Sequence, residues 1–170
     1  MDDALRFVVE MNEAIWGRLK NAIEDLSEEE IHWRHLPQAN SINVIIRHLR
    51  IEAQWHLDSL EGGEPMPTIT APAPQKAIAA VPADFEENLK KLEELYTRYM
   101  EVLRTATLAT LRQRTAADYG EASGLPYRLA YHQATHLAMH YGQIHTIRNL
   151  YRKTRGEPAR FLPENPTYPN

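Results

Sequence analysis

Residues 126–154, PYRLAYHQATHLAMHYGQIHTIRNLYRKT, predict a long helix near the end of the chain. Pro126 suits the first turn of a helix, where its missing backbone N–H would have no helical partner in any case. Gly156 follows the segment and is typical of a residue just beyond a helix C-terminus. We therefore expect one helix from Pro126 to about Thr154.

Three earlier segments carry apolar residues at steps of three and four, the spacing of a helix with one buried face. They run from about Asp3 to Leu26, from Ser41 to Leu60 and from Asp84 to about Thr105. The side chains expected to face the core in the first segment are Phe7, Met11, Ala14, Ile15, Leu19, Ala22 and Leu26. Four long amphipathic helices without a convincing strand predict an all-α protein, a four-helix bundle.

The connections between these helices differ in character. Ser27-Glu28-Glu29-Glu30 has the pattern of a capping box and predicts a short helix from Glu28 to about His35. The stretch from Leu108 to Gly124 is ambiguous, with expected turns at Tyr119-Gly120 and Ser123-Gly124.

Prolines fall mainly outside the helical segments. Five of them lie between about Gly62 and Pro82, so a long proline-rich loop is expected between the second and third long helices. A loop of this length suits a crossover along the bundle. Four more lie in the last part of the chain, where residues 157–170 are expected to form an extended tail.

Length and composition restrict the class of protein. A chain of 170 residues with 43% hydrophobic content is expected to be a single domain over residues 1–170. The absence of cysteine excludes disulfides, thiolate zinc sites and a cysteine nucleophile. A net charge of -4 argues against a nucleic-acid partner, and no apolar run approaches the roughly 20 residues of a membrane span. The N-terminus lacks the pattern of a signal peptide, so a cytoplasmic location is expected.

Three of the eight histidines recur at steps of four in the last segment: His132, His136 and His140. Residues four apart lie on one face of a helix, so two imidazoles can converge on one metal ion. His48, flanked by apolar residues in the second long segment, is expected to supply a third ligand from a facing helix. Three protein ligands leave one position open, as catalytic sites do.

Other metal-site patterns fit less well. Leu137 follows His136, so the glutamate of a metalloprotease His-Glu-x-x-His motif is missing. A di-iron carboxylate bundle needs two Glu-x-x-His motifs, and Glu29-x-x-His32 is the one match. The remaining histidines, His32, His35, His56 and His145, are expected to be exposed, to cap helices or to support the ligands.

The region around His48, followed downstream by His136-Leu-Ala-Met-His140-Tyr-Gly-Gln-Ile144, resembles the DinB/YfiT-like superfamily of metal-binding four-helix bundles. The resemblance covers roughly Asp3 to Arg155 and includes the proline-rich loop. It implies a left-handed crossover, a homodimer, and a divalent metal ion such as nickel or zinc. The positions that match the superfamily's ligands are His48, His136 and His140.

The resemblance also implies a reaction class. Several relatives are metal-dependent S-transferases that join a low-molecular-weight thiol, such as bacillithiol or mycothiol, to an electrophile, and others are described as hydrolases. A metal ion lowers the pKa of a thiol or water that it holds, and the thiolate is the attacking species. Because the chain has no cysteine, a thiol must arrive as a cosubstrate.

Side chains next to the expected ligands have possible supporting roles. Glu52, one turn after His48, and His132, one turn before His136, are candidates for ligand support or proton transfer. Gln143 is a further hydrogen-bonding candidate.

Two alternatives to the thiol transferase stay open. The first is a metal-dependent hydrolase, and the second is a non-catalytic metal-binding or structural stress protein whose ion staples two helices. A fourth side-chain ligand, such as Glu52 or His132, would favour the second alternative. For the homodimer, apolar residues expected on outward faces, among them Trp16, Ile23 and Trp33, would form the contact.

Overall fold

A computed structural model describes residues 2–63, 81–119 and 127–159, and these residues form helices without any strand. The helices are α1 (Asp3–Ile23), α2 (Glu28–His32), α3 (Ile42–Glu61), α5 (Phe85–Thr105), α6 (Leu108–Tyr119) and α7 (Arg128–Thr154). The predicted all-α class is confirmed. Within the described ranges, no helix combines the length and the apolar character needed to cross a lipid bilayer.

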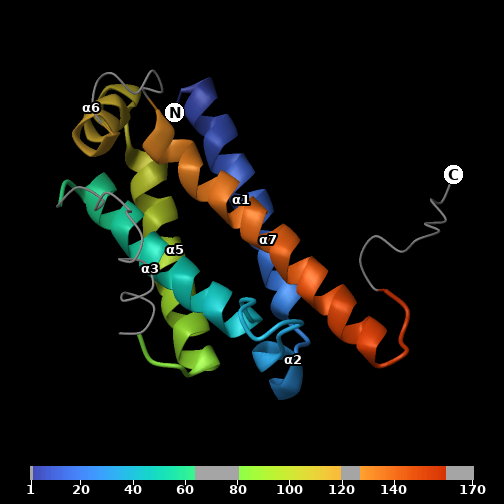
Figure 1. Cartoon of the computed structure of the whole chain (residues 1–170). Helices are drawn as coiled ribbons and strands as arrows, with labels where there is room; N and C mark the ends of the chain where they lie inside the picture. The colour runs from blue at the N-terminus through green and yellow to red at the C-terminus, as the bar shows by residue number, and fades with distance from the viewer. Residues whose placement is uncertain (1, 64–80, 120–126, 160–170) are drawn as a thin grey trace, which may run out of the picture.

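The four long helices pack as two pairs, α1 with α7 and α3 with α5, and the two helices of each pair run in the same direction (Figure 1). In the α1–α7 pair, Asn12 lies near Ala130 and Ala22 lies near Arg148, with hydrogen bonds of 3.4 Å and 2.6 Å. In the α3–α5 pair, the Asn43 side chain near the start of α3 donates to the carbonyl of Ala83, just before α5, at 2.7 Å. Near the other ends of the two helices, Arg98 of α5 donates to Glu61 of α3 at 2.8 Å, so α3 and α5 run in the same direction. The proline-rich segment expected to form a crossover along the bundle, residues 64–80, lies outside the described residues.

Local sequence signals explain where the helices begin and end. Asp2, Ser27, Ser41 and Asp84 each accept a backbone N–H from the first turn of the helix that follows. Helix α3 ends at Gly62, whose φ of 89° is a left-handed conformation that favours glycine. The cap predicted at Ser27 is therefore confirmed, and Asp2, Ser41 and Asp84 cap the other helices in the same way.

Several predicted boundaries need correction. Helix α1 ends at Ile23 and not near Leu26, and α2 ends at His32 because Trp33 has an extended backbone with ψ of 144°. The ambiguous stretch after residue 108 is helical to Tyr119. Pro126 and the turns predicted between residues 120 and 124 fall outside the described residues, and α7 is described from Arg128.

The buried face of α1 differs from the predicted one. The side chains that face the core are Leu5, Val9, Asn12, Leu19, Ala22 and Ile23. Phe7, which was expected to face the core, is 65% exposed. Asn12 is the physical reason, because its amide donates to the carbonyls of Val8 and Ala130 and so occupies the centre of the buried row. A buried polar residue breaks the apolar pattern and shifts the predicted face.

The apolar residues expected to form an outward patch do not form one. Ile23 is only 5% exposed. Trp16 stacks on Tyr96 at a centroid distance of 4.4 Å, and Trp33 packs edge-on against Tyr151 at 5.7 Å. These three side chains contribute to the packing of one chain, so a homodimer would need a different surface.

Candidate metal centre

Three histidines from two helices meet at one point. The Nε2 atom of His136 on α7 lies 3.0 Å from Nε2 of His48 on α3 and 3.0 Å from Nε2 of His140. One ligand atom from each of the three lies within 4.8 Å of the others. Within the described residues, no fourth His, Asp or Glu joins this group.

The antiparallel arrangement of α3 and α7 brings these residues together. His48 lies against His136 and His140, and His56, two turns later on α3, lies against His132, one turn earlier on α7. The histidine face of α7 follows from the four-residue spacing of His132, His136 and His140. The contact between the two faces follows from helix packing. His140 is buried, whereas His48 and His136 are half-buried.

Burial keeps the three rings neutral. It lowers the pKa of His48 to about 4, and the nearby His140 lowers it further in the same direction. The pKa of His136 lies lower still, first because of burial and then because of the neighbouring histidines. Burial also lowers the pKa of His140, although its hydrogen bond with Gln143 opposes this shift. Near neutral pH each ring therefore has a nitrogen lone pair available.

The donor set fits a divalent ion. Nδ1 of His140 lies 2.9 Å from the side-chain oxygen of Gln143, which can only accept. Nδ1 must carry the proton, and Nε2 of His140 then presents its lone pair to the cluster. Neutral imidazole nitrogens suit zinc, nickel and copper, whereas magnesium and calcium prefer oxygen. The structure thus places Gln143 at the site, where the sequence had indicated it as a hydrogen-bonding candidate.

Glu52 lies close to the cluster along α3 without being part of it. Its side chain is buried, with 3% exposure, and it sits between His48 and His56 on the helix. Burial raises the pKa of Glu52 to about 7. The carboxyl group can therefore hold or release a proton near neutral pH.

His132 and His56 form a second histidine pair beside the cluster. Nε2 of His56 lies 2.7 Å from Nδ1 of His132. The His132 ring is nearly parallel to that of His136, at 10° and a centroid distance of 5.8 Å. Neither His132 nor Glu52 supplies a fourth ligand, so the coordination sphere that would favour a purely structural ion is not formed by them.

His56 is the residue near the site that sequence reasoning did not single out. Its side chain is fully buried, with 0% exposure, and burial lowers its pKa to about 4. Its spacing of eight residues from His48, on the same helix face, was the available signal. Of the other histidines, His32 and His35 are exposed, and His145 packs against Tyr141 with ring centroids 4.0 Å apart.

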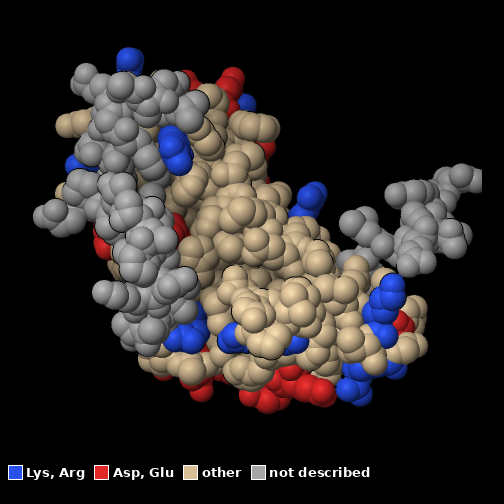
Figure 2. Space-filling view, viewed as in Figure 1, with Lys and Arg blue, Asp and Glu red and all other residues tan. Residues whose placement is uncertain are grey.

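The surface of α7 beside the cluster carries little charge. Between Leu129 and Tyr151 the helix has one Arg and no Lys, Asp or Glu, and this residue, Arg148, is buried. Figure 2 shows the middle of α7 as a surface almost free of charged side chains, with acidic groups gathered along the lower edge.

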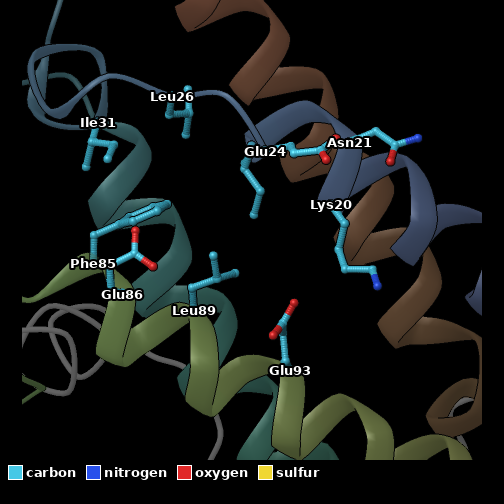
Figure 3. A pocket seen from close by; sticks show the side chains of 10 residues that line it. Lys20, Asn21, Glu24, Leu26, Ile31, Phe85, Glu86, Leu89 and Glu93 are labelled. Atoms are coloured by element: carbon cyan, nitrogen blue, oxygen red, sulfur yellow. The ribbon is translucent and has the colours of Figure 1, made fainter.

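A separate cavity of about 370 Å³ lies between α1, the α2 region and α5. Figure 3 shows Lys20 of α1 and Glu93 of α5 pointing toward each other across it, with Phe85 and Leu89 on the α5 side. Its lining includes no histidine, so this cavity does not belong to the metal cluster.

Comparison with known proteins identifies a family that the chain matches. A family model described as mycothiol-S-transferase matches residues 10–153. The matched segment contains the three clustered histidines together with Glu52, His56 and His132. No curated protein and no solved structure matches the chain.

Proposed function

The chain belongs to the mycothiol-S-transferase family, within the DinB/YfiT-like metal-binding superfamily, and from this premise we propose that it transfers a low-molecular-weight thiol to a small electrophile in a metal-dependent reaction. The observation that carries the proposal is the three-histidine group without a fourth side-chain ligand among the described residues. Catalytic sites keep such an open position, whereas structural sites are closed.

His48, His136 and His140 would hold the ion, which we propose to be nickel or zinc. A divalent ion in this position would lower the pKa of a thiol and make the thiolate available near neutral pH. The protein contributes neutral rings, because burial lowers the pKa of each of the three histidines. Gln143 contributes a fixed orientation for His140 through the 2.9 Å hydrogen bond.

The proton of the thiol needs an acceptor. Glu52 is our first candidate, since it is buried one turn from His48 and its pKa is raised to about 7 by burial. A base with a pKa near the working pH is the most effective one. His132, on the facing helix, is the second candidate.

The proposed reaction needs a thiol that supplies the sulfur and an electrophilic carbon that carries a leaving group. The sulfur electron pair forms a bond to carbon, the electrophile's leaving group takes the electrons of the bond that breaks, and the thiol proton passes to the protein. The sulfur must come from a cosubstrate because the chain has no cysteine. Mycothiol is the first thiol to test, since the family is named for it, and bacillithiol is the second. We place the reaction in the cytoplasm, where such thiols are kept reduced.

We further propose a homodimer through the uncharged surface of α7. Its exposed residues include Thr135, Met139, Gly142 and Thr146, at steps of four, three and four, and Met139 is 52% exposed. Depletion of charge is typical of the centre of a protein interface. Sedimentation should give a dimer at micromolar concentration for the native chain and a monomer for Met139→Lys. A monomeric native chain would contradict this part of the proposal.

The activity test compares metal-loaded and metal-free protein with mycothiol, bacillithiol, glutathione and cysteine against a generic electrophile. We expect transfer by the loaded protein and none above background by the metal-free protein or by His136→Ala. Glu52→Gln should keep its metal and lose about 10²- to 10⁴-fold in rate, the usual contribution of a general base. His145→Ala, on the same helix but outside the cluster, is the matched control and should retain full activity.

Other outcomes would favour the alternatives. Metal-dependent ester or amide hydrolysis without thiol transfer would favour a hydrolase. Tight metal binding with neither reaction would favour a non-catalytic metal-binding protein. If His48→Ala and His140→Ala both retain tightly bound metal at one ion per chain, the three-histidine site itself is wrong.

A further inference from the structure

We infer that His56 and His132 are a positioning pair, which holds the ring of His136 so that its Nε2 atom faces His48 and His140. The inference rests on the proposed metal site and adds to it two residues with no contact to the ion. It concerns how the protein orients one ligand before any metal binds.

Among the described residues, none gives His136 the hydrogen bond that normally orients a metal-binding histidine. Such a residue usually donates its second ring N–H to an acceptor, which fixes the ring. His140 has this bond, to Gln143. The buried Nδ1 of His136 has no hydrogen-bond partner in the described part of the chain. Another contact must therefore set the orientation of the His136 ring.

The ring of His132 provides that contact. It lies one turn earlier on α7, nearly parallel to His136 at 10° and 5.8 Å between centroids, within the range of offset-stacked rings. His48 and His140 meet His136 edge-on, at 76° and 86°. His136 is thus confined between one parallel ring and two crossing rings.

His132 is itself fixed from the other helix by His56. Nδ1 of His56 lies 2.7 Å from the backbone carbonyl of Glu52, which can only accept, so this nitrogen carries a proton. In a neutral ring, Nε2 of His56 then has a lone pair. It accepts from Nδ1–H of His132 at 2.7 Å, which leaves Nε2 of His132 unprotonated. One set of tautomers follows for both residues.

The two contacts also join α3 to α7 at two levels. His48 meets His136, and two turns later His56 meets His132. A shift of either helix along the other would break both contacts together. The His56–His132 bond therefore holds the helix alignment that the ligand cluster requires.

The experiment measures Co²⁺ affinity by competition with a chromophoric chelator, and the visible absorption of the bound Co²⁺. His132→Ala removes the ring and should weaken binding about 10- to 100-fold, the usual effect of losing a residue that orients a ligand. His132→Phe keeps the ring face and should recover most of that loss. His56→Gln should fall between the two. His145→Ala, whose ring packs on Tyr141, should bind within about 2-fold of the native chain.

Two further measurements distinguish positioning of the His136 ring from an effect on folding stability alone. Thermal unfolding of each metal-free variant reports whether it folds, and only folded variants are compared for affinity. Nuclear magnetic resonance of the ring nitrogens in the metal-free native chain should show His56 and His132 both protonated at Nδ1. This measurement needs no variant.

Each outcome has one meaning. A native chain that binds Co²⁺ while all folded variants bind it equally well would overturn the positioning pair and leave the proposed function intact. Protonation of His132 at Nε2 would also overturn the pair. A native chain that binds no Co²⁺, Ni²⁺ or Zn²⁺ would overturn the proposed function, and the pair with it.

Discussion

Replacing His56 with glutamine should make the metal-free bundle less sensitive to acid. The His56 side chain is completely buried, and burial lowers its pKa from 6.5 to about 4. In the unfolded chain the same residue is exposed and takes up a proton at its ordinary pKa. Acid therefore favours the unfolded state, and the stabilisation present above pH 6.5 is lost as the pH falls toward 4.

The size of the effect follows from these two pKa values. A difference of one pKa unit corresponds to about 1.4 kcal/mol, so the full difference between 6.5 and about 4 amounts to roughly 3.4 kcal/mol. At pH 5 the unfolded state is mostly protonated and the folded state mostly is not. The loss relative to pH 8 is then about 2 kcal/mol from His56 alone.

Urea denaturation of the chelator-treated protein at pH 8 and pH 5 provides the assay. The other buried histidines destabilise the fold in acid as well. Glu52, with its raised pKa, acts in the opposite direction. The informative quantity is therefore the difference between variants. The free energy of unfolding should fall by about 2 kcal/mol less in His56→Gln than in the native chain.

His35→Gln is the matched control, because this histidine is exposed in the folded chain, and its acid response should equal that of the native chain. An acid response of His56→Gln that is also equal to the native one would refute the reasoning. It would mean that His56 reaches water, or keeps its proton, in the folded state.

Three further predictions concern stability and can be checked by urea or thermal unfolding. Leu137→Ala, at a position with 0% exposure, should cost about 2–5 kcal/mol by leaving a cavity between α7 and its neighbours, and a smaller loss would mean that the core collapses around it. Ser41→Ala should cost about 1 kcal/mol, because the hydroxyl accepts the N–H of Val44 at the start of α3, and Ser41→Asp should restore the stability. Glu30→Ala should cost about 1.5–3 kcal/mol, because it removes the 2.7 Å partner of the buried Arg148, which keeps its 3.0 Å contact with Asp25, and an unchanged midpoint would show that Asp25 alone is sufficient.

Features that depend on near neighbours in the chain were predictable. The caps at Ser27 and Ser41 follow from a hydroxyl placed three residues before a free N–H, and this geometry is local. The pairing of His136 with His140 on one face is local for the same reason. The boundaries were less accurate. Helix α2 ends at His32, because the extended backbone of Trp33 allows its ring to pack against Tyr151, far away in the sequence.

Features that depend on contacts between helices were predicted less well. Asn12 is buried because the carbonyl of Ala130 on another helix accepts its amide, and nothing around residue 12 signals this partner. Because the side of α1 that carries Asn12 faces the core, Phe7 lies on the exposed side of the helix. The outward patch expected from Trp16, Ile23 and Trp33 is not formed, because Ile23 is buried and each tryptophan packs against an aromatic side chain of another helix.

The sequence by itself determined the helical class, the cap at Ser27 and the histidine face of the last helix, because capping and the placement of residues four apart on one side are local properties of a helix. Only the tertiary structure decided that the His48 face meets the His136–His140 face, since that depends on how the long helices pack and on the direction in which each one runs. The tertiary structure also decided the burial of Glu52 and His56. Their pKa values depend on removal from water, which is a property of the packed bundle and not of the neighbouring residues in the chain.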